Sequence, residues 1–206
     1  MAYSDFTLAK AKQAFGLNLT EQRGLFDAIA GVSPSAFLAE ALARYTTLAT
    51  AIGTEKARSE FLIAPVLAEV KLQRNNQISL FSGTEFNVNA EQGLVGFCDF
   101  LISAAQEQLF ISAPVATIVE AKKEDIIGGL GQCAATMVGA QQFNQQAGNA
   151  IDRIYGVVTS GTNWRFLMLE GDRLEIDLTE YYISQIDKIL GILLQPFQPA
   201  LATSNT

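Results

Sequence analysis

The spacing of apolar residues changes at the polar stretch 74–76, and this change constrains the fold more than any other feature of the chain. Before it, apolar positions in 55–73 repeat at the 3.6-residue spacing of an amphipathic helix, with Pro65 indicating a kink or short break. After it, short segments rich in β-branched and aromatic residues lie between Gly, Asn and Pro, which is typical of strands. The sequence therefore predicts helices first and a sheet afterwards.

The later part of the chain alternates between strand and helix patterns. Three successive strands are predicted within 78–122, a helix at 124–146, two or three strands within 154–178 and a last helix at 183–194. We therefore expect an α/β fold.

The same pattern divides the chain into three parts. We expect an all-helical N-terminal extension at 1–54, an α/β core at 55–195 and a flexible C-terminal tail at 196–206. Thr20, followed by the acidic Glu21, is the predicted N-cap of a helix in the extension.

The composition excludes several classes of chemistry. The chain contains no histidine, which rules out a Ser-His triad, a histidine general base and a zinc site with histidine ligands. Cys98 and Cys133 lie in apolar surroundings and are expected to be reduced, buried thiols. The first ten residues do not resemble a secretory signal, and no apolar run has transmembrane length, so we expect a cytoplasmic protein without membrane contact.

Charge is distributed unevenly along the chain. The net charge is −7; residues 1–76 carry 8 basic and 7 acidic side chains, and residues 77–206 carry 6 basic and 14 acidic ones. This balance argues against broad non-specific binding of nucleic acid. If a polyanion does bind, we expect the N-terminal part to help hold it and a divalent cation to offset the acidic part.

Three residues in the strand region form a candidate catalytic group. Glu120 and Lys122 are two apart in one predicted strand and therefore share a face. Asp99 interrupts another apolar strand, where an ionised carboxylate is costly unless it is paired or binds a metal. If the two strands are neighbours, Asp99 and Glu120 converge on one divalent ion, and oxygen ligands favour Mg²⁺ or Mn²⁺. Lys122 would then hold a phosphate or orient the attacking water.

The order Asp99, a spacer of about twenty residues and then Glu120-x-Lys122 at a strand end resembles the PD-(D/E)xK, or restriction-endonuclease-like, superfamily. The stretch 154–169 is similar to the strand-turn-strand of the N-terminal nuclease domains of type I restriction enzyme R subunits. The resemblance runs from about residue 58 to residue 169, with Cys98 where proline is usual.

The resemblance adds two residues and a function. It implies that Glu60, on the preceding helix, joins Asp99 and Glu120 as a metal ligand, and that Gln132, on the following helix, joins the catalytic set. It further implies a restriction-endonuclease-like core, with a central mixed sheet flanked by helices in α-β-β-β-α-β order. The implied function is that of a nuclease dependent on Mg²⁺ or Mn²⁺ that acts on DNA rather than RNA, and the implied state is a homodimer.

Two other interpretations stay open. Glu120 and Lys122 alone would be read as a surface ion pair, and Glu60 as a solvated helix residue. The protein would then be a catalytically silent module of the same fold that acts in protein interaction or assembly.

The glycines of the 124–146 helix mimic a dinucleotide-binding fingerprint, with Gly129 and Gly131 at the first two positions. The charged residues 122–125 separate them from the preceding strand, so no tight strand-to-helix turn forms. We expect Gly128, Gly129 and Gly131 to allow close approach of the helix to the sheet instead.

Overall fold

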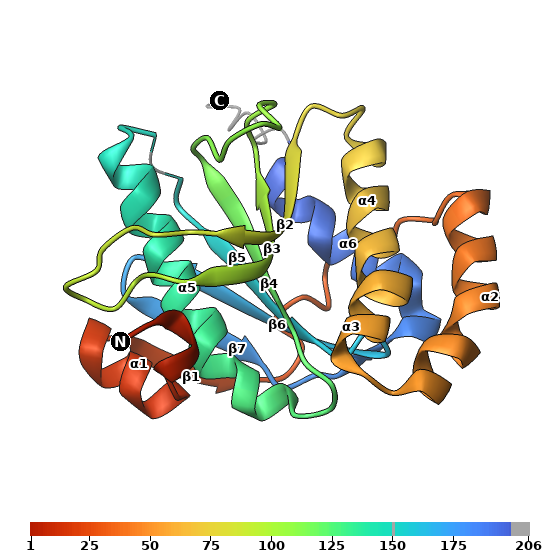
Figure 1. The fold of residues 1–206 in the computed structure, drawn as a ribbon, viewed down its shortest axis with the longest axis horizontal. Coiled ribbons are helices and arrows are strands. Elements are labelled where there is room, and N and C mark those ends of the chain that lie inside the picture. The colour runs from red at the N-terminus through yellow and green to blue at the C-terminus, as the bar shows by residue number, and fades with distance from the viewer. Residues whose placement is uncertain (150, 199–206) are drawn as a thin grey trace.

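Within residues 1–149 and 151–198, which the computed structural model describes, the chain folds around one mixed sheet of eight strands with helices on both faces (Figure 1). The strands are β1 (Asn18–Gln22), β2 (Ser79–Glu85), β3 (Phe97–Ser103), β4 (Val115–Ala121), β5 (Ile154–Thr159), β6 (Asn163–Glu170), β7 (Arg173–Asp177) and β8 (Tyr181–Tyr182). The α-helices are α1 (Leu8–Phe15), α2 (Ala36–Ile52), α3 (Glu55–Arg58), α4 (Ala64–Gln73), α5 (Ile126–Gln146) and α6 (Ile186–Leu194). The short turns are the 3-10 helices η1 (Tyr3–Asp5), η3 (Ile183–Gln185) and η4 (Gln195–Phe197), and the π-helical turn η2 (Ser59–Ile63).

The sheet is open and mixed. Its strand order is β1-β7-β6-β5-β4-β3-β2, with β8 paired to β6. The β4–β5 and β1–β7 pairs are parallel and the others are antiparallel. A parallel neighbour requires a crossover connection, which α5 supplies between β4 and β5. The predicted α/β class, with a central mixed sheet flanked by helices, is thus confirmed.

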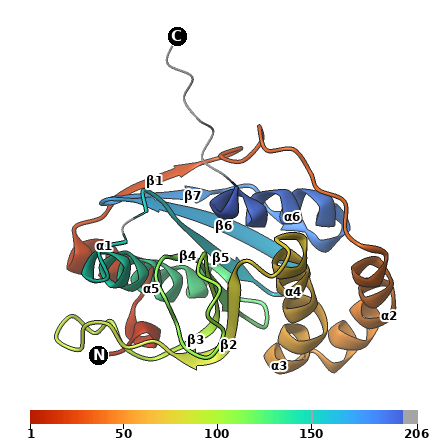
Figure 2. The same ribbon diagram turned by 90° about the horizontal axis from the view of Figure 1, so that it is seen from above.

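Strand β4 separates two apolar layers, because all its residues are buried. Ile118 lies in the layer beneath α5, and its neighbour Val119 lies in the layer beneath α4 and α6. Figure 2 shows α1 and α5 on one side of the sheet and α4 and α6 on the other. Cys98 and Cys133 are free and buried in the α5 layer, as predicted.

The prediction of an all-helical extension at 1–54 is wrong, because Asn18–Gln22 form β1. This strand pairs in parallel with β7, more than 150 residues later in the chain. Thr20, the predicted N-cap, therefore lies in a strand, and α1 begins after Thr7, whose hydroxyl accepts a hydrogen bond from the amide of Lys10 (3.3 Å). The residues of β1 show no apolar alternation, so only the tertiary pairing defines this strand.

The C-terminal prediction is tested only in part. Residues 199–206 of the predicted flexible tail lie outside the described residues. Gln195–Phe197 form η4, and Phe197 is buried in the layer beneath α4 and α6. The folded core therefore extends beyond the predicted boundary at residue 195.

The predicted helix at 55–73 is confirmed, but its hydrogen-bonding pattern changes along its length. The α3, η2 and α4 segments are continuous, and the π-helical turn lies directly before Pro65, which lacks an amide hydrogen. The buried Arg58 anchors this helix to the β5–β6 turn by donating hydrogen bonds to Ser160 O (3.0 Å) and Thr162 Oγ1 (3.1 Å). The break expected at Pro65 is thus a local change to π-helical geometry.

The glycines of α5 make different close approaches. A Cβ at Gly129 would lie 2.7 Å from Val158 on β5, so this glycine does allow the predicted approach to the sheet. A Cβ at Gly131 would instead lie 2.3 Å from the Phe6 carbonyl oxygen and from the Thr7 carbonyl carbon, so Gly131 seats the start of α1. At Gly128 the atoms nearest to the added Cβ would be those of the Asp125 side chain, which caps α5. The prediction is right for Gly129 and wrong for the other two.

No helix in residues 1–149 and 151–198 combines the length and the apolar character needed to cross a membrane.

Gly131→Ala should destabilise the fold by about 1–3 kcal/mol, because the new methyl group overlaps backbone atoms that cannot rotate away. The direction of the stability change is informative, because at a solvent-exposed helix position the same substitution stabilises the helix by about 1 kcal/mol. Urea unfolding would measure the change. Gln145→Ala, at an exposed position of α5, should stay within about 0.5 kcal/mol of wild type. Equal stability of Gly131→Ala and wild type would contradict the close seating of α1 on α5.

Candidate active site

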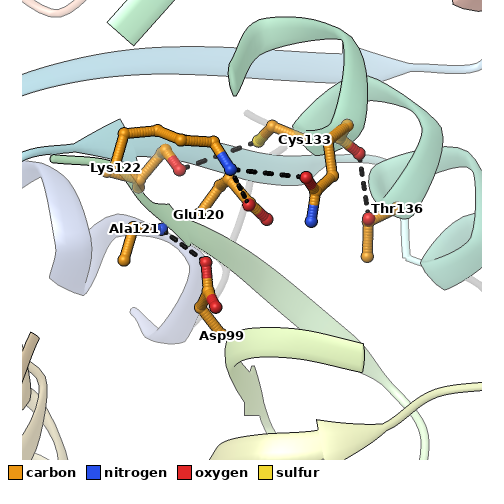
Figure 3. A network of polar contacts seen from close by, with 8 residues as sticks. Asp99, Glu120, Ala121, Lys122, Cys133 and Thr136 are labelled. Atoms are coloured by element: carbon orange, nitrogen blue, oxygen red, sulfur yellow. Dashed lines mark hydrogen bonds and ion pairs between the residues drawn. The ribbon is translucent and has the colours of Figure 1, made fainter. Parts of the chain in front are cut away.

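Asp99 and Glu120 lie on neighbouring antiparallel strands, as the sequence analysis required. The β3–β4 register pairs Phe100 with Val119, which places the two acidic residues beside each other. The carboxylate of Asp99 accepts a hydrogen bond from the amide of Ala121 (2.8 Å), which fixes its side chain across the end of β4 (Figure 3). Asp99 is only half-buried, because it lies near the open start of β3.

Lys122 joins this pair directly after β4. Its ammonium donates hydrogen bonds to Glu120 Oε1 (2.6 Å) and, more weakly, to Gln132 Oε1 on α5 (3.4 Å). The Lys122 side chain is 24% exposed and that of Glu120 only 3%, so the contact between them is largely shielded from water. The structure therefore brings together four of the five predicted residues: Asp99, Glu120, Lys122 and Gln132.

Glu120 carries the strongest electrostatic perturbation of this group. Burial, followed by the negative charge of Asp99, raises the pKa of Glu120 to about 8, and the nearby Lys122 only partly opposes this. At neutral pH the metal-free site therefore keeps a proton on Glu120. Two adjacent carboxylates in a shielded cavity repel each other, and a proton or a cation relieves that repulsion.

The pKa of Lys122 is raised as well, but for a lysine a raised pKa favours the charged form. Burial disfavours its charge, but Glu120 and Asp99 outweigh burial, and the pKa of Lys122 is raised. The metal-free site thus favours the charged form of Lys122. Lys122 is instead a charged hydrogen-bond donor that points toward the cavity.

Glu60 does not join the other four residues. It lies on η2, a segment that packs in the layer beneath α4 and α6, whereas Glu120 and Lys122 face α5. Its side chain is 53% exposed and forms an ion pair with Lys56 (2.8 Å). Glu60 shares with Asp99 a second cavity, of about 250 Å³, on the other side of β3 and β4.

Glu55 is the acidic residue that the sequence analysis missed. It lines both the second cavity and the cavity that holds Asp99, Glu120 and Lys122, which we call the main cavity, and its charge contributes to the raised pKa of Lys122. It occupies the first turn of α3, behind the N-cap Thr54, where an acidic residue has a sufficient local explanation in the helix dipole. Its position beside Asp99 depends on how α3 packs in the folded protein, and the local sequence pattern does not indicate that packing.

The main cavity has a volume of about 420 Å³. It is lined by Ala2, Tyr3, Ser4, Glu55, Gly96, Phe97, Asp99, Glu120, Lys122 and Gln132. Within the described part of the chain, no three histidine, cysteine, aspartate or glutamate side chains converge closely enough to form a ready-made metal cage. The cavity thus offers two adjacent carboxylates, a third at its wall, an ammonium and an amide.

Comparisons of the chain with protein-family models, with curated proteins and with solved structures gave no significant match.

Glu120→Gln should stabilise the metal-free protein increasingly as the pH rises. Between its ordinary pKa of 4.5 and the folded-state pKa of about 8, the folded protein keeps a proton that the unfolded chain has released, so stability falls as pH rises through this window. Glutamine removes this dependence. At about 1.4 kcal/mol per pKa unit, we expect the variant to be roughly 2–4 kcal/mol more stable than wild type at pH 9, and closer to it at pH 5.

Denaturant titrations in EDTA from pH 5 to pH 9 would measure this difference. Glu60→Gln is the matched control, because its carboxylate is exposed. If the stability curves of Glu120→Gln and wild type stayed parallel across this range, the buried proton would be ruled out.

Proposed function

We propose that the protein is a metal-dependent nuclease that hydrolyses the phosphodiester bonds of DNA in preference to those of RNA. The observation that carries the proposal is the group formed by Asp99, Glu120, Lys122 and Gln132 in one cavity. A surface ion pair does not account for it, because Glu120 is buried and its pKa is raised. Strongly perturbed acids in a cavity are typical of functional sites.

The residues present fit a divalent cation by the chemistry of their donors. Asp99 and Glu120 supply adjacent carboxylates, and Mg²⁺ is commonly held by one or two protein carboxylates together with water and substrate phosphate. The lack of a three-residue cage in the described chain is compatible with this mode of binding. A bound Mg²⁺ or Mn²⁺ would acidify a water molecule and stabilise charge on the phosphate.

The chain's own residues then divide the remaining tasks. Lys122 donates a charged hydrogen bond into the cavity and is placed to bind a phosphate oxygen. Gln132 holds the lysine ammonium from the α5 side. Asp99 is fixed by the Ala121 amide, so its carboxylate is oriented before a substrate arrives.

Two features implied by the family resemblance remain proposals: the restriction-endonuclease-like identity of the α/β core and a homodimeric state. We also propose a cytoplasmic location, which does not depend on that resemblance.

A catalytically silent module for protein interaction or assembly is the second candidate. One observation favours it: in the metal-free state the Glu120–Lys122 pair satisfies itself, and the described residues form no metal cage. This candidate predicts that the four site residues affect folding but no chemical reaction.

Wild type should cleave at least one nucleic acid with Mg²⁺ or Mn²⁺, and Lys122→Ala should reduce the rate by about 100-fold or more, since it removes a positioned charge donor. The assay would offer supercoiled plasmid, linear duplex, single-stranded DNA and RNA. Asp99→Ala should also lose activity, whereas the exposed neighbour Lys123→Ala should not. No cleavage by wild type, or equal rates for Lys122→Ala and wild type, would favour the silent module.

Glu55 and Glu60 compete for the role of third carboxylate, and the two cavities separate them. We expect Glu55→Gln to lower metal-dependent cleavage about 10-fold or more, because Glu55 lies at the wall of the cavity that holds Glu120 and Lys122. Glu60→Gln should change the rate less than about 3-fold, since Glu60 lies in the other layer. Rates measured over a Mg²⁺ titration would decide, and a larger effect of Glu60→Gln would restore the ligand expected from the sequence.

A further inference from the structure

An exposed aromatic ring stands at the edge of the main cavity. Phe97 is the first residue of β3 and is 66% exposed, whereas Phe100, Leu101 and Ile102 of the same strand are buried. Phe97 lines the cavity together with Asp99, and residues two apart in a strand share a face. An apolar ring of this size is therefore presented to whatever occupies the site.

The cavity is closed on one side by η1. The amide of Tyr3 donates a hydrogen bond to Val95 O (3.0 Å), and the buried Tyr3 ring stacks on Phe86. A Cβ at Gly96 would already lie 3.5 Å from the Tyr3 ring. This wall is thus held by packing, and the cavity of about 420 Å³ has the volume of a small-molecule pocket.

The charges around the cavity disfavour a duplex. Proteins that bind duplex DNA neutralise several phosphates with Lys and Arg. Among the residues that line the two cavities, the cations are Lys56 and Lys122, and they face Glu55, Glu60, Asp99 and Glu120. Since phosphate contacts are few, recognition of a nucleic acid here has to depend on its bases.

We propose that Phe97 is a stacking platform for an unpaired base next to the scissile phosphate, and that the site takes single-stranded DNA, such as an overhang or a flap, rather than intact duplex. The inference rests on the proposed nuclease function and specifies its substrate class. An aromatic face stacks on any base without reading its sequence. Stacking therefore gives affinity where the acidic surroundings provide little.

Cleavage kinetics would test this with one oligonucleotide sequence in three forms: single-stranded, blunt duplex and duplex with a single-stranded overhang. Wild type should cleave the single-stranded and overhang forms at least about 10-fold faster than the blunt duplex. Phe97→Ala should raise KM for the single strand roughly 10- to 100-fold with a smaller change in kcat. Phe97→Trp should retain the wild-type KM, and Phe97→Leu should not.

Phe37→Ala is the matched control, because Phe37 is another exposed phenylalanine, on α2 and away from both cavities. Equal cleavage of duplex and single strand, or equal KM values for Phe97→Ala and Phe37→Ala, would overturn the inference while leaving a nuclease in place.

A measurement of binding without catalysis distinguishes this inference from the proposed nuclease function. Fluorescence anisotropy of a labelled single strand, without added metal, should show tighter binding than for the duplex and a loss of that binding in Phe97→Ala. Such binding without cleavage of any substrate would support the stacking platform and reject the nuclease. Absence of binding to the single strand would overturn the inference.

Discussion

The site depends on the pleat of β4. Because this strand is buried on both faces, each of its side chains must enter one of two apolar layers, and a polar side chain in either layer needs a partner there. Glu120 enters the layer beneath α5. Lys122, two residues later, leaves the strand on the same side and supplies the partner at 2.6 Å. The Glu-x-Lys spacing is thus the shortest that lets a buried carboxylate and its cation share one side of a strand.

The same pleat explains why the candidate site has two parts. The apolar residues of η2 pack in the layer beneath α4 and α6. A carboxylate on η2 therefore reaches the second cavity and does not reach Glu120. Asp99 connects the two parts, since it lies near the open start of β3 and its carboxylate crosses the end of β4 to the Ala121 amide. Glu55, at the first turn of α3, is the other acidic residue common to both cavities.

These contacts also define what the sequence can and cannot predict. Asp99, Glu120 and Lys122 were predictable because a strand's period of two is a local property, and because strands that follow each other along the chain are usually neighbours in a sheet. Glu60 was predicted to be a metal ligand because its helix precedes the strands in the sequence. The place of a helix in the sequence does not determine which face of the sheet the helix covers. Strand β1 was missed for a related reason: the residues Asn18–Gln22 carry no strand pattern, and pairing with β7 alone makes them a strand. Glu55 was missed because the helix dipole already explains an acidic residue in the first turn of a helix.

The energetics of the cluster do not favour a purely stabilising role. Replacing a buried ion pair by apolar residues of similar size is often neutral or stabilising, so such a pair is weak evidence for stability alone. Here a second carboxylate, Asp99, lies against the pair and raises the pKa of Glu120 further, which makes the arrangement more costly at neutral pH. The proton on Glu120 limits that cost while the cavity is metal-free. Binding of a divalent cation by these carboxylates would then be coupled to release of this proton, so cation affinity should rise with pH up to about 8, in the direction opposite to the stability of the metal-free fold.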